Sequence, residues 1–148
     1  MSERSFSREV QLLSLGDGDI FTGEGIVAVT KAALQSGVSY FGGYPGSPIS
    51  QLVDVLSQAT DVMDKYGIHL EICASEATAA AMLGASINYP IRGLVTWKSV
   101  VGTNVASDAL TYLASPGVIG GSVIVIGEDY GDGAAAVQER SYGFSLKS

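Results

Sequence analysis

Glu76 is the residue whose type and position in this sequence best fit a chemical role. It follows Ser75 at the start of a predicted helix, just past the carboxyl end of the apolar run 68–73, which predicts a strand. The helix behind it consists largely of alanine and glycine, so it can pack closely against another backbone and leave the carboxylate at an apolar surface. A carboxylate withdrawn from water holds a proton more readily and can share it with a ring nitrogen of a bound ligand. The alternative is structural, because a carboxylate in a first helical turn stabilises the helix by roughly 0.3–1 kcal/mol.

Charged and amide side chains follow the next predicted strand, 93–97. Lys98, Asn104 and Asp108 begin the crossover after this strand, and Arg140 begins a later helix-like segment. Either cation could hold the carboxylate of a substrate, Arg140 by a bidentate fork. The alternative for each is a solvated position on the surface.

A Gly/Pro-rich turn, Gly43-Tyr44-Pro45-Gly46-Ser47-Pro48, separates an apolar run that predicts a strand from a periodic run that predicts a helix. Such a turn at the carboxyl end of a strand is where open α/β sheets bind ligands, since glycine permits close approach of the backbone. Pro48 suits the first helical position, with Ser47 as its N-cap. The alternative is a well-made connection with no ligand.

Several other kinds of site are excluded or disfavoured. The sequence has neither a G-x-G-x-x-G after a strand nor a G-x-x-x-x-G-K-[ST], so the usual phosphate cradles are missing. It has no G-x-S-x-G, and its one histidine, His69, falls within a predicted strand, which disfavours a hydrolase triad. The Gly-Asp-Gly triplets 16–18 and 131–133 lack the later asparagine of a metal–diphosphate motif, so we interpret both as turns.

Composition narrows the class further. One cysteine, Cys73, and one histidine exclude a disulfide framework and a self-contained iron–sulfur cluster, disfavour a structural zinc site, and lead us to predict no metal site in this chain. The net charge of −7 gives no basic footprint for nucleic acid. Residues 1–10 are not a signal peptide, and the most apolar window, 117–127, is too short to span a membrane. We expect a cytoplasmic protein.

Strands and helices alternate along the chain. The predicted strands are 38–41, 68–73, 93–97 and 122–126, the predicted helices are 24–34, 49–67, 76–88 and 104–113, and a helix-like segment begins near 134. This order predicts an α/β fold, a parallel sheet with helices on both faces. We expect residues 1–15 to form an N-terminal arm and residues 16–148 to form one domain, and we expect the chain to be a piece of a longer polypeptide.

Four stretches together resemble a known family. They are GYPGSPIS (43–50), SEA (75–77), TWK (96–98) and GTNVASD (102–108). They are similar to the pyrimidine-binding domain of the 2-oxoacid:ferredoxin oxidoreductases, and within that family to the indolepyruvate ferredoxin oxidoreductase alpha subunits. The resemblance runs from about residue 16 to the end of the sequence. Its most specific part is the Y-P-G-[TS]-P turn together with the later glutamate.

The resemblance implies a thiamine diphosphate-binding fold and an activity. Members of this family use thiamine diphosphate to decarboxylate a 2-oxoacid oxidatively, form an acyl-CoA, and pass electrons through iron–sulfur clusters to ferredoxin. The family's pyrimidine-binding domain supplies a glutamate to the N1′ nitrogen of the cofactor, and Glu76 matches it. The proton shared there lets the 4′-imino group take up the thiazolium proton.

Other matches imply further contacts. By resemblance, the cofactor-binding residues are Glu76, Tyr44, Pro45, Gly46 and Asn104. Also by resemblance, the substrate-binding residues are Ser47, Lys98 and Arg140. The family's K-H-V-G-L-N-V-A stretch departs here, because residues 98–106 read KSVVGTNVA, without the histidine and with one residue inserted. Residues 134–139 depart as well, so the 2-oxoacid stays open, with indolepyruvate or another aryl pyruvate preferred.

Parts of such an enzyme are missing from these 148 residues. The domain that binds the diphosphate and Mg²⁺, and the cysteines of the clusters, are expected in another domain or subunit, within a homo- or hetero-oligomer. The small-residue helix after Glu76 is then an assembly surface, or else it packs on its own sheet. Two other hypotheses stay open: a non-catalytic binding or regulatory module of the same fold, and a non-redox thiamine-dependent decarboxylase or carboligase.

Overall fold

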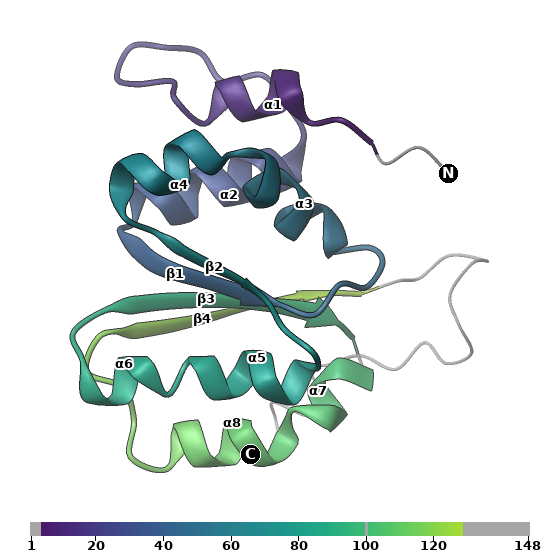
Figure 1. The fold of residues 1–148 in the computed structure, drawn as a ribbon, viewed down its shortest axis with the longest axis vertical. Helices are drawn as coiled ribbons and strands as arrows, with labels where there is room; N and C mark the ends of the chain where they lie inside the picture. The colour runs from purple at the N-terminus through teal and green to yellow at the C-terminus, as the bar shows by residue number, and fades with distance from the viewer. Residues whose placement is uncertain (1–3, 100, 129–148) are drawn as a thin grey trace.

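A parallel sheet lies at the centre of the fold. The computed structural model describes residues 4–99 and 101–128, and within these ranges it has four strands in the order β2-β1-β3-β4, all parallel (Figure 1). The strands are β1 (Val38–Gly43), β2 (His69–Ile72), β3 (Arg92–Lys98) and β4 (Gly121–Gly127). The predicted α/β fold class and all four predicted strands are confirmed.

Helices form a layer on each face of this sheet. In Figure 1, α2, α3 and α4 lie on one face and α5 to α8 on the other, while α1 packs outside the first layer. Their bounds are α1 (Ser7–Leu12), α2 (Gly25–Gln35), α3 (Ser50–Gln58), α4 (Thr60–Tyr66), α5 (Glu76–Met82), α6 (Ala85–Asn88), α7 (Val101–Val105) and α8 (Ser107–Ala114). Because the strands are parallel, their carboxyl ends share one edge of the sheet.

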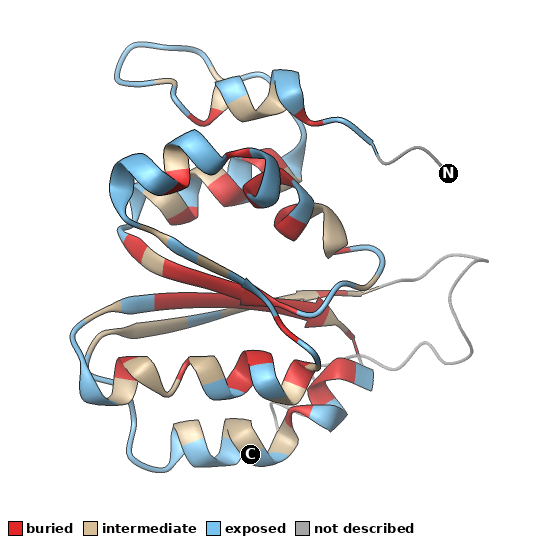
Figure 2. Cartoon of the chain, in the orientation of Figure 1, coloured by how far each residue is buried: buried red, intermediate tan, exposed pale blue. Residues whose placement is uncertain are grey.

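Neighbouring residues of each central strand face opposite cores. On β1, Tyr40 packs with Leu83 and Trp97 on the α5 side, whereas Phe41 packs with Leu56 on the α3 side. Figure 2 shows β1 and β3 buried along most of their length. Strands that are apolar towards both faces are typical of parallel sheets covered by helices on both sides.

Three predicted helices are interrupted. The predicted helix 49–67 is broken at Ala59, whose φ of −100° and ψ of 35° are not helical. Ala59 is buried with apolar residues of the N-terminal arm and α2, so tertiary packing overrides the helical period there. The predicted helix 76–88 is divided at Leu83-Gly84 into α5 and α6. The predicted helix 104–113 begins earlier, at Val101, and is interrupted at Ala106.

The helix after the Gly/Pro-rich turn also begins later than predicted. α3 begins at Ser50 with Ile49 as its N-cap, so the predicted capping role of Ser47 and the predicted first-turn position of Pro48 are wrong. The Gly46 carbonyl accepts hydrogen bonds from the N–H groups of Ile49 (3.0 Å) and Ser50 (2.9 Å). The backbone of the turn therefore satisfies these donors without the Ser47 hydroxyl. The Ser47–Pro48 peptide bond is cis.

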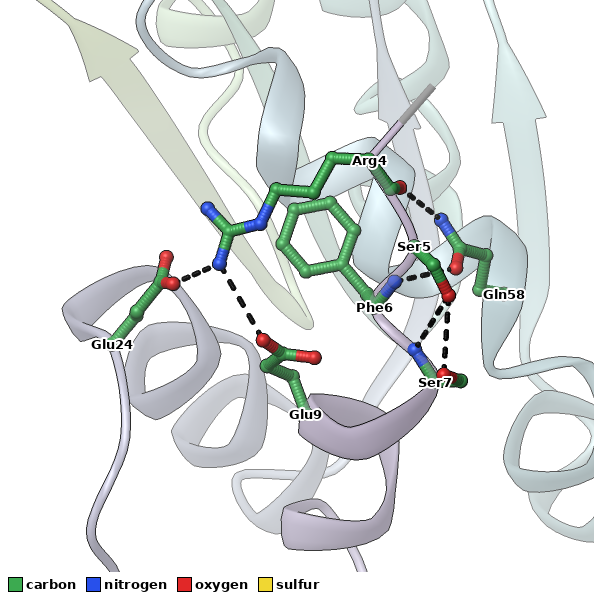
Figure 3. A network of polar contacts seen from close by, with 7 residues as sticks. All are labelled: Arg4, Ser5, Phe6, Ser7, Glu9, Glu24 and Gln58. Carbon is green, nitrogen blue, oxygen red and sulfur yellow. Dashed lines mark hydrogen bonds and ion pairs between the residues drawn. The ribbon is translucent and has the colours of Figure 1, made fainter. Parts of the chain in front are cut away.

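The N-terminal arm packs on α2 and α3 through Phe6. This side chain is 1% exposed and lies in a cluster with Val27 and Val55. Its N–H donates to Gln58 Oε1 (2.8 Å), and Gln58 Nε2 donates to the Arg4 carbonyl (3.4 Å) (Figure 3). Because these bonds join residues more than fifty positions apart, they fix the arm to the end of α3.

Charged groups cover the Phe6 ring. The Arg4 guanidinium lies over it, 4.7 Å from the ring centroid. The same guanidinium donates to Glu9 on α1 (3.4 Å) and to Glu24, the N-cap residue of α2 (Figure 3). Arg4 therefore links these two helices. These ion pairs are solvent-exposed, so we attribute the anchoring of the arm mainly to the buried ring.

Candidate functional site

The carboxyl ends of β1 and β3 hold the Gly/Pro-rich turn. Gly43, the last residue of β1, pairs with Ile72 on β2 and with Thr96 on β3. The Tyr44 N–H donates to the Thr96 carbonyl (3.1 Å), and the Cys73 N–H donates to the Gly43 carbonyl (2.8 Å). The turn and the loop that leads to Glu76 are therefore tied to the same edge of the sheet.

Lys98 lies against this turn. A Cβ added at Gly46 would lie 2.9 Å from the Lys98 Cβ, so only glycine lets the turn approach the end of β3 this closely. Lys98 is half-buried, whereas Tyr44, Pro45 and Ser47 are exposed. The structure thus brings together two of the predicted substrate-binding residues, Ser47 and Lys98, with the three predicted cofactor-binding residues of the turn.

Glu76 is the first residue of α5 and is only 7% exposed. A Cβ at Gly102 would lie 3.0 Å from the Glu76 Cγ, so the stem of Glu76 packs directly against α7. Among the described residues, the Glu76 carboxylate has no hydrogen-bond or ion-pair partner. Buried polar groups in native proteins are nearly always paired. Glu76 is therefore a nearly buried residue whose carboxylate oxygens still reach the surface and pair with no described group, which is the arrangement expected of a group that contacts a ligand.

Ser75 sets where α5 begins. Its Oγ accepts a hydrogen bond from the Thr78 N–H (3.2 Å), which confirms the predicted N-cap. We expect Ser75→Ala to lower the free energy of unfolding by about 1 kcal/mol, because one helix donor loses its acceptor. Urea unfolding measures this loss. Ser75→Asp is the control, because it restores an acceptor at the cap and should lose much less; equal losses in the two variants would argue against the cap.

Of the remaining residues singled out by the sequence, some lie among the described residues and some do not. Asn104 is exposed on α7, two residues after Gly102. Arg140 lies outside the described residues, as do the triplet 131–133 and the helix-like segment from 134, so its substrate contact stays a prediction. The triplet 16–18 lies in a turn.

Sequence reasoning missed the wall behind Glu76. The indole of Trp97 is fully buried, and its Nε1–H donates to Thr103 Oγ1 (3.1 Å). A Cβ at Gly102 would lie 2.5 Å from the Trp97 Cδ1. Trp97 and Gly102 stand in the motifs that carry the family resemblance, but only the packing of α7 on β3 shows that they meet Glu76.

Cys73 lies at the same edge, in the loop between β2 and α5. Its Sγ is 3.5 Å from Met82 Sδ and 3.8 Å from the Glu71 carbonyl. Burial raises the pKa of the Cys73 thiol above its ordinary value of 9.0, and the charge of Glu71 acts in the same direction, against the hydrogen bond with Gly43. The thiol is therefore a neutral packing group near neutral pH.

This shift predicts how Cys73 reacts and how stability changes with pH. Iodoacetamide should alkylate the folded protein more slowly than the urea-unfolded protein, with a rate that rises only at strongly alkaline pH, because the thiolate is the nucleophile. Since the folded pKa lies above the unfolded pKa, this contribution to stability is present below the unfolded pKa and is lost as the pH rises towards the folded pKa. Equal alkylation rates in the folded and unfolded protein would contradict the prediction.

Three hollows in the described surface are lined neither by Glu76 nor by the turn, although one of them borders Trp97 and Thr103 behind Glu76. One, of about 550 Å³, lies between the N-terminal arm, α2 and α4, by the first residue of β1. Another, of about 580 Å³, lies between α5 and α8, and the third, of about 660 Å³, lies between α8 and β4. None of the three is lined by Glu76, so the candidate site is an edge of the domain and not one of these hollows.

Other features of the described residues bear on the class of protein. No helix there has both the length and the apolar character needed to cross a bilayer. In the same ranges, no three His, Cys, Asp or Glu side chains are grouped so that they could hold a metal ion. His69 is exposed on the edge strand β2, with its Nε2 3.6 Å from Glu71 Oε2.

Curated proteins similar to this chain share one name, "Indolepyruvate oxidoreductase subunit IorA". The protein from Methanothermobacter marburgensis is 34% identical over 118 residues, which are 80% of this chain and 18% of the relative. Those from Archaeoglobus fulgidus and Thermococcus kodakarensis are 36% and 32% identical over 104 and 102 residues, each 69% of this chain, and 16% and 15% of the relatives. No family model and no solved structure matches.

The chain spans less than a fifth of the length of these relatives. The similarity nevertheless covers more than two thirds of this chain and recurs in several organisms, so it is not confined to one short motif. The chain is therefore related to the IorA subunits of indolepyruvate oxidoreductase, which confirms the resemblance to the 2-oxoacid:ferredoxin oxidoreductases that its motifs predict.

Proposed function

We propose that this chain supplies the pyrimidine-binding side of a thiamine diphosphate site in a 2-oxoacid:ferredoxin oxidoreductase that acts on indolepyruvate or another aryl pyruvate. The observation that carries the proposal is Glu76, a residue that is 7% exposed and whose carboxylate reaches the surface without a partner among the described residues. An aminopyrimidine ring offers such a carboxylate a ring nitrogen with which it can share a proton. The similarity to proteins named for indolepyruvate supports the choice of substrate class.

The residues of the edge fit this cofactor. Glu76 would hold the ring nitrogen, while the backbone of Tyr44, Pro45 and Gly46 would line the approach to it. Gly46 lies so close to Lys98 that a side chain would not fit, so the turn is held against the end of β3. Asn104, exposed on α7, would contact the cofactor from the other side of Glu76.

The substrate would lie on the side of the turn. Ser47 offers a hydroxyl group, and Lys98 offers positive charge for the carboxylate of a 2-oxoacid. We propose Arg140 as a further carboxylate ligand, by its match to the family motif. An aromatic 2-oxoacid also needs apolar surface, which the exposed ring of Tyr44 provides at this edge.

In this proposal, the chemical role of the chain is to hold one proton between Glu76 and a ring nitrogen of the cofactor. When bound, thiamine diphosphate supplies the carbon that attacks the 2-oxoacid and accepts the electrons left by decarboxylation. Glu76 holds a proton at the ring nitrogen, and the surrounding apolar residues keep water from competing for it. The carboxylate therefore sets the basicity of the bound pyrimidine ring.

The proposal requires partners. The diphosphate and its Mg²⁺ would be held by another domain or subunit, electrons would leave through iron–sulfur clusters to ferredoxin, and CoA would take up the acyl group. Apolar side chains are exposed on the helices next to Glu76, and they are Val101, Val105 and Tyr112. Apolar groups exposed beside a site are typical of a surface covered in an assembly. We therefore place a cytoplasmic partner domain, in a homo- or hetero-oligomer, on the α7–α8 side.

Two measurements on the complete enzyme complex test this function. Titration calorimetry should show binding of thiamine diphosphate with Mg²⁺, and indolepyruvate with CoA should then reduce a low-potential dye. Absence of thiamine diphosphate binding would overturn the proposal and favour a non-catalytic module of the same fold. Thiamine-dependent decarboxylation that needs no electron acceptor would instead indicate a non-redox decarboxylase or carboligase.

A further inference from the structure

We infer that Gly102, Trp97 and Thr103 are positioning residues that fix the side chain of Glu76 for contact with the cofactor. This inference rests on the proposed function. None of the three needs to touch the cofactor. They act through Glu76, by forming a wall against which its aliphatic stem lies.

Gly102 allows the wall and the glutamate to meet. A Cβ at this position would lie 2.5 Å from Trp97 Cδ1, 2.9 Å from Trp97 Cγ and 3.0 Å from Glu76 Cγ. The two separations from Trp97 are shorter than real Cβ contacts, and the one from Glu76 is tighter than most, so any side chain here would force α7 and the indole apart. Gly102 is not among the described glycines with positive φ, so space and not backbone conformation requires glycine here.

Trp97 cannot readily make that space. Its indole is fully buried, and its N–H is bonded to Thr103 Oγ1, which is itself 2% exposed. Turning the ring would leave a buried donor without its acceptor. Since Thr103 and Gly102 are neighbours on α7, one short helix both holds the ring and contacts Glu76. A side chain added at Gly102 would therefore push α7 away from β3, and the surface against which the Glu76 stem lies would move with it.

The consequence for Glu76 is a restricted set of side-chain conformations. A glutamate has three rotatable side-chain bonds, and fixing them costs conformational entropy. The wall excludes the side-chain conformations in which the Glu76 stem would enter the space occupied by α7 or by the indole. This restriction is present before any ligand binds. The carboxylate is thus pre-placed, and a displacement of about 1 Å in such a group can cost roughly 100-fold in rate.

The main test is Gly102→Ala in the complete enzyme complex. We expect kcat to fall by roughly 100-fold while the KM for the 2-oxoacid changes little, because the added methyl shifts α7, and with it the support of the Glu76 stem, but not the turn that would hold the substrate. Hydrogen–deuterium exchange at the thiazolium carbon of bound thiamine diphosphate, measured without substrate, should slow by a similar factor. Gly23→Ala is the control, because its Cβ would also crowd a side chain, Leu12 Cδ1 at 2.8 Å, but in the loop before α2 and not at the candidate site.

A second pair of variants separates positioning from folding. Thr103→Val keeps the shape of the side chain and removes the acceptor that holds the indole, whereas Thr103→Ser keeps the hydroxyl. We expect Thr103→Val to slow the exchange roughly tenfold and Thr103→Ser to retain most of the wild-type rate. This pair decides the question if Gly102→Ala does not fold.

The outcomes distinguish the two proposals. Wild-type enzyme that does not bind thiamine diphosphate would overturn the proposed function itself. Wild-type enzyme that binds it, together with unchanged exchange rates in Gly102→Ala or in Thr103→Val, would overturn the positioning role alone.

Discussion

Replacing Glu76 by glutamine should lower 2-oxoacid oxidation by about 10²–10⁴-fold, the range in which a positioned proton donor or acceptor contributes to catalysis. Glutamine has the same shape, so the packing of the stem against Gly102 is kept. An amide cannot share a proton with a ring nitrogen as a carboxyl group does. Steady-state turnover of the complete complex with indolepyruvate, CoA and a low-potential acceptor measures this loss, and gel filtration checks that the complex still assembles.

Glu71→Gln is the matched control for this variant. Glu71 is an exposed glutamate on the outer strand β2, and its carboxylate lies near the His69 ring on the same strand. The same change of charge at this position should leave turnover near the wild-type rate. If Glu76→Gln turned over as fast as this control, Glu76 would have no role in the chemistry.

Replacing Phe6 by alanine should lower the free energy of unfolding by about 3–5 kcal/mol, the usual cost of deleting a buried phenylalanine. The ring is 1% exposed and packs with Val27 and Val55, so its removal leaves a cavity between the arm, α2 and α3. Denaturant unfolding of the wild type and the variant gives the difference. A loss of this size would make the arm a part of the folded domain and not an appendage.

Arg4→Ala is the comparison for Phe6→Ala. Arg4 joins Glu9 and Glu24 and covers the Phe6 ring, but its ion pairs are solvent-exposed and screened by salt (Figure 3). Arg4→Ala should lower the free energy of unfolding far less than Phe6→Ala does, and this loss should become smaller as salt is added. Similar losses in the two variants would show that the charged cover anchors the arm, and not the buried ring.

The strands were predictable because their signals are local. Each is a short apolar run bounded by turn residues, and in the run 122–126 the four residues after Ser122 are all β-branched valine or isoleucine, which strongly favours a strand. The helical segments were predictable too, but the positions at which they are interrupted were not, because the interruptions have tertiary causes. Ala59 leaves the helical conformation where α3 packs under the N-terminal arm, and no feature of its local sequence marks that contact.

The parts of the candidate site that depend on local sequence were predictable, and the parts that depend on packing were not. Ser75 and Glu76 follow a strand and open a helix, so their place at the carboxyl edge follows from the order of elements. The cap assigned to Ser47 was wrong because the Gly46 carbonyl competes for the same donors, which depends on the fold of the turn. The wall formed by Trp97 and Gly102 could not be foreseen, since it depends on how closely α7 approaches β3.

The most direct test of the central claim is a structure of the complete complex with thiamine diphosphate and Mg²⁺ bound. The account predicts a Glu76 carboxyl oxygen about 2.6–3.2 Å from a ring nitrogen of the aminopyrimidine, with its stem still against Gly102. A structure in which another acidic residue pairs with that nitrogen, while Glu76 lies remote from the cofactor, would contradict it.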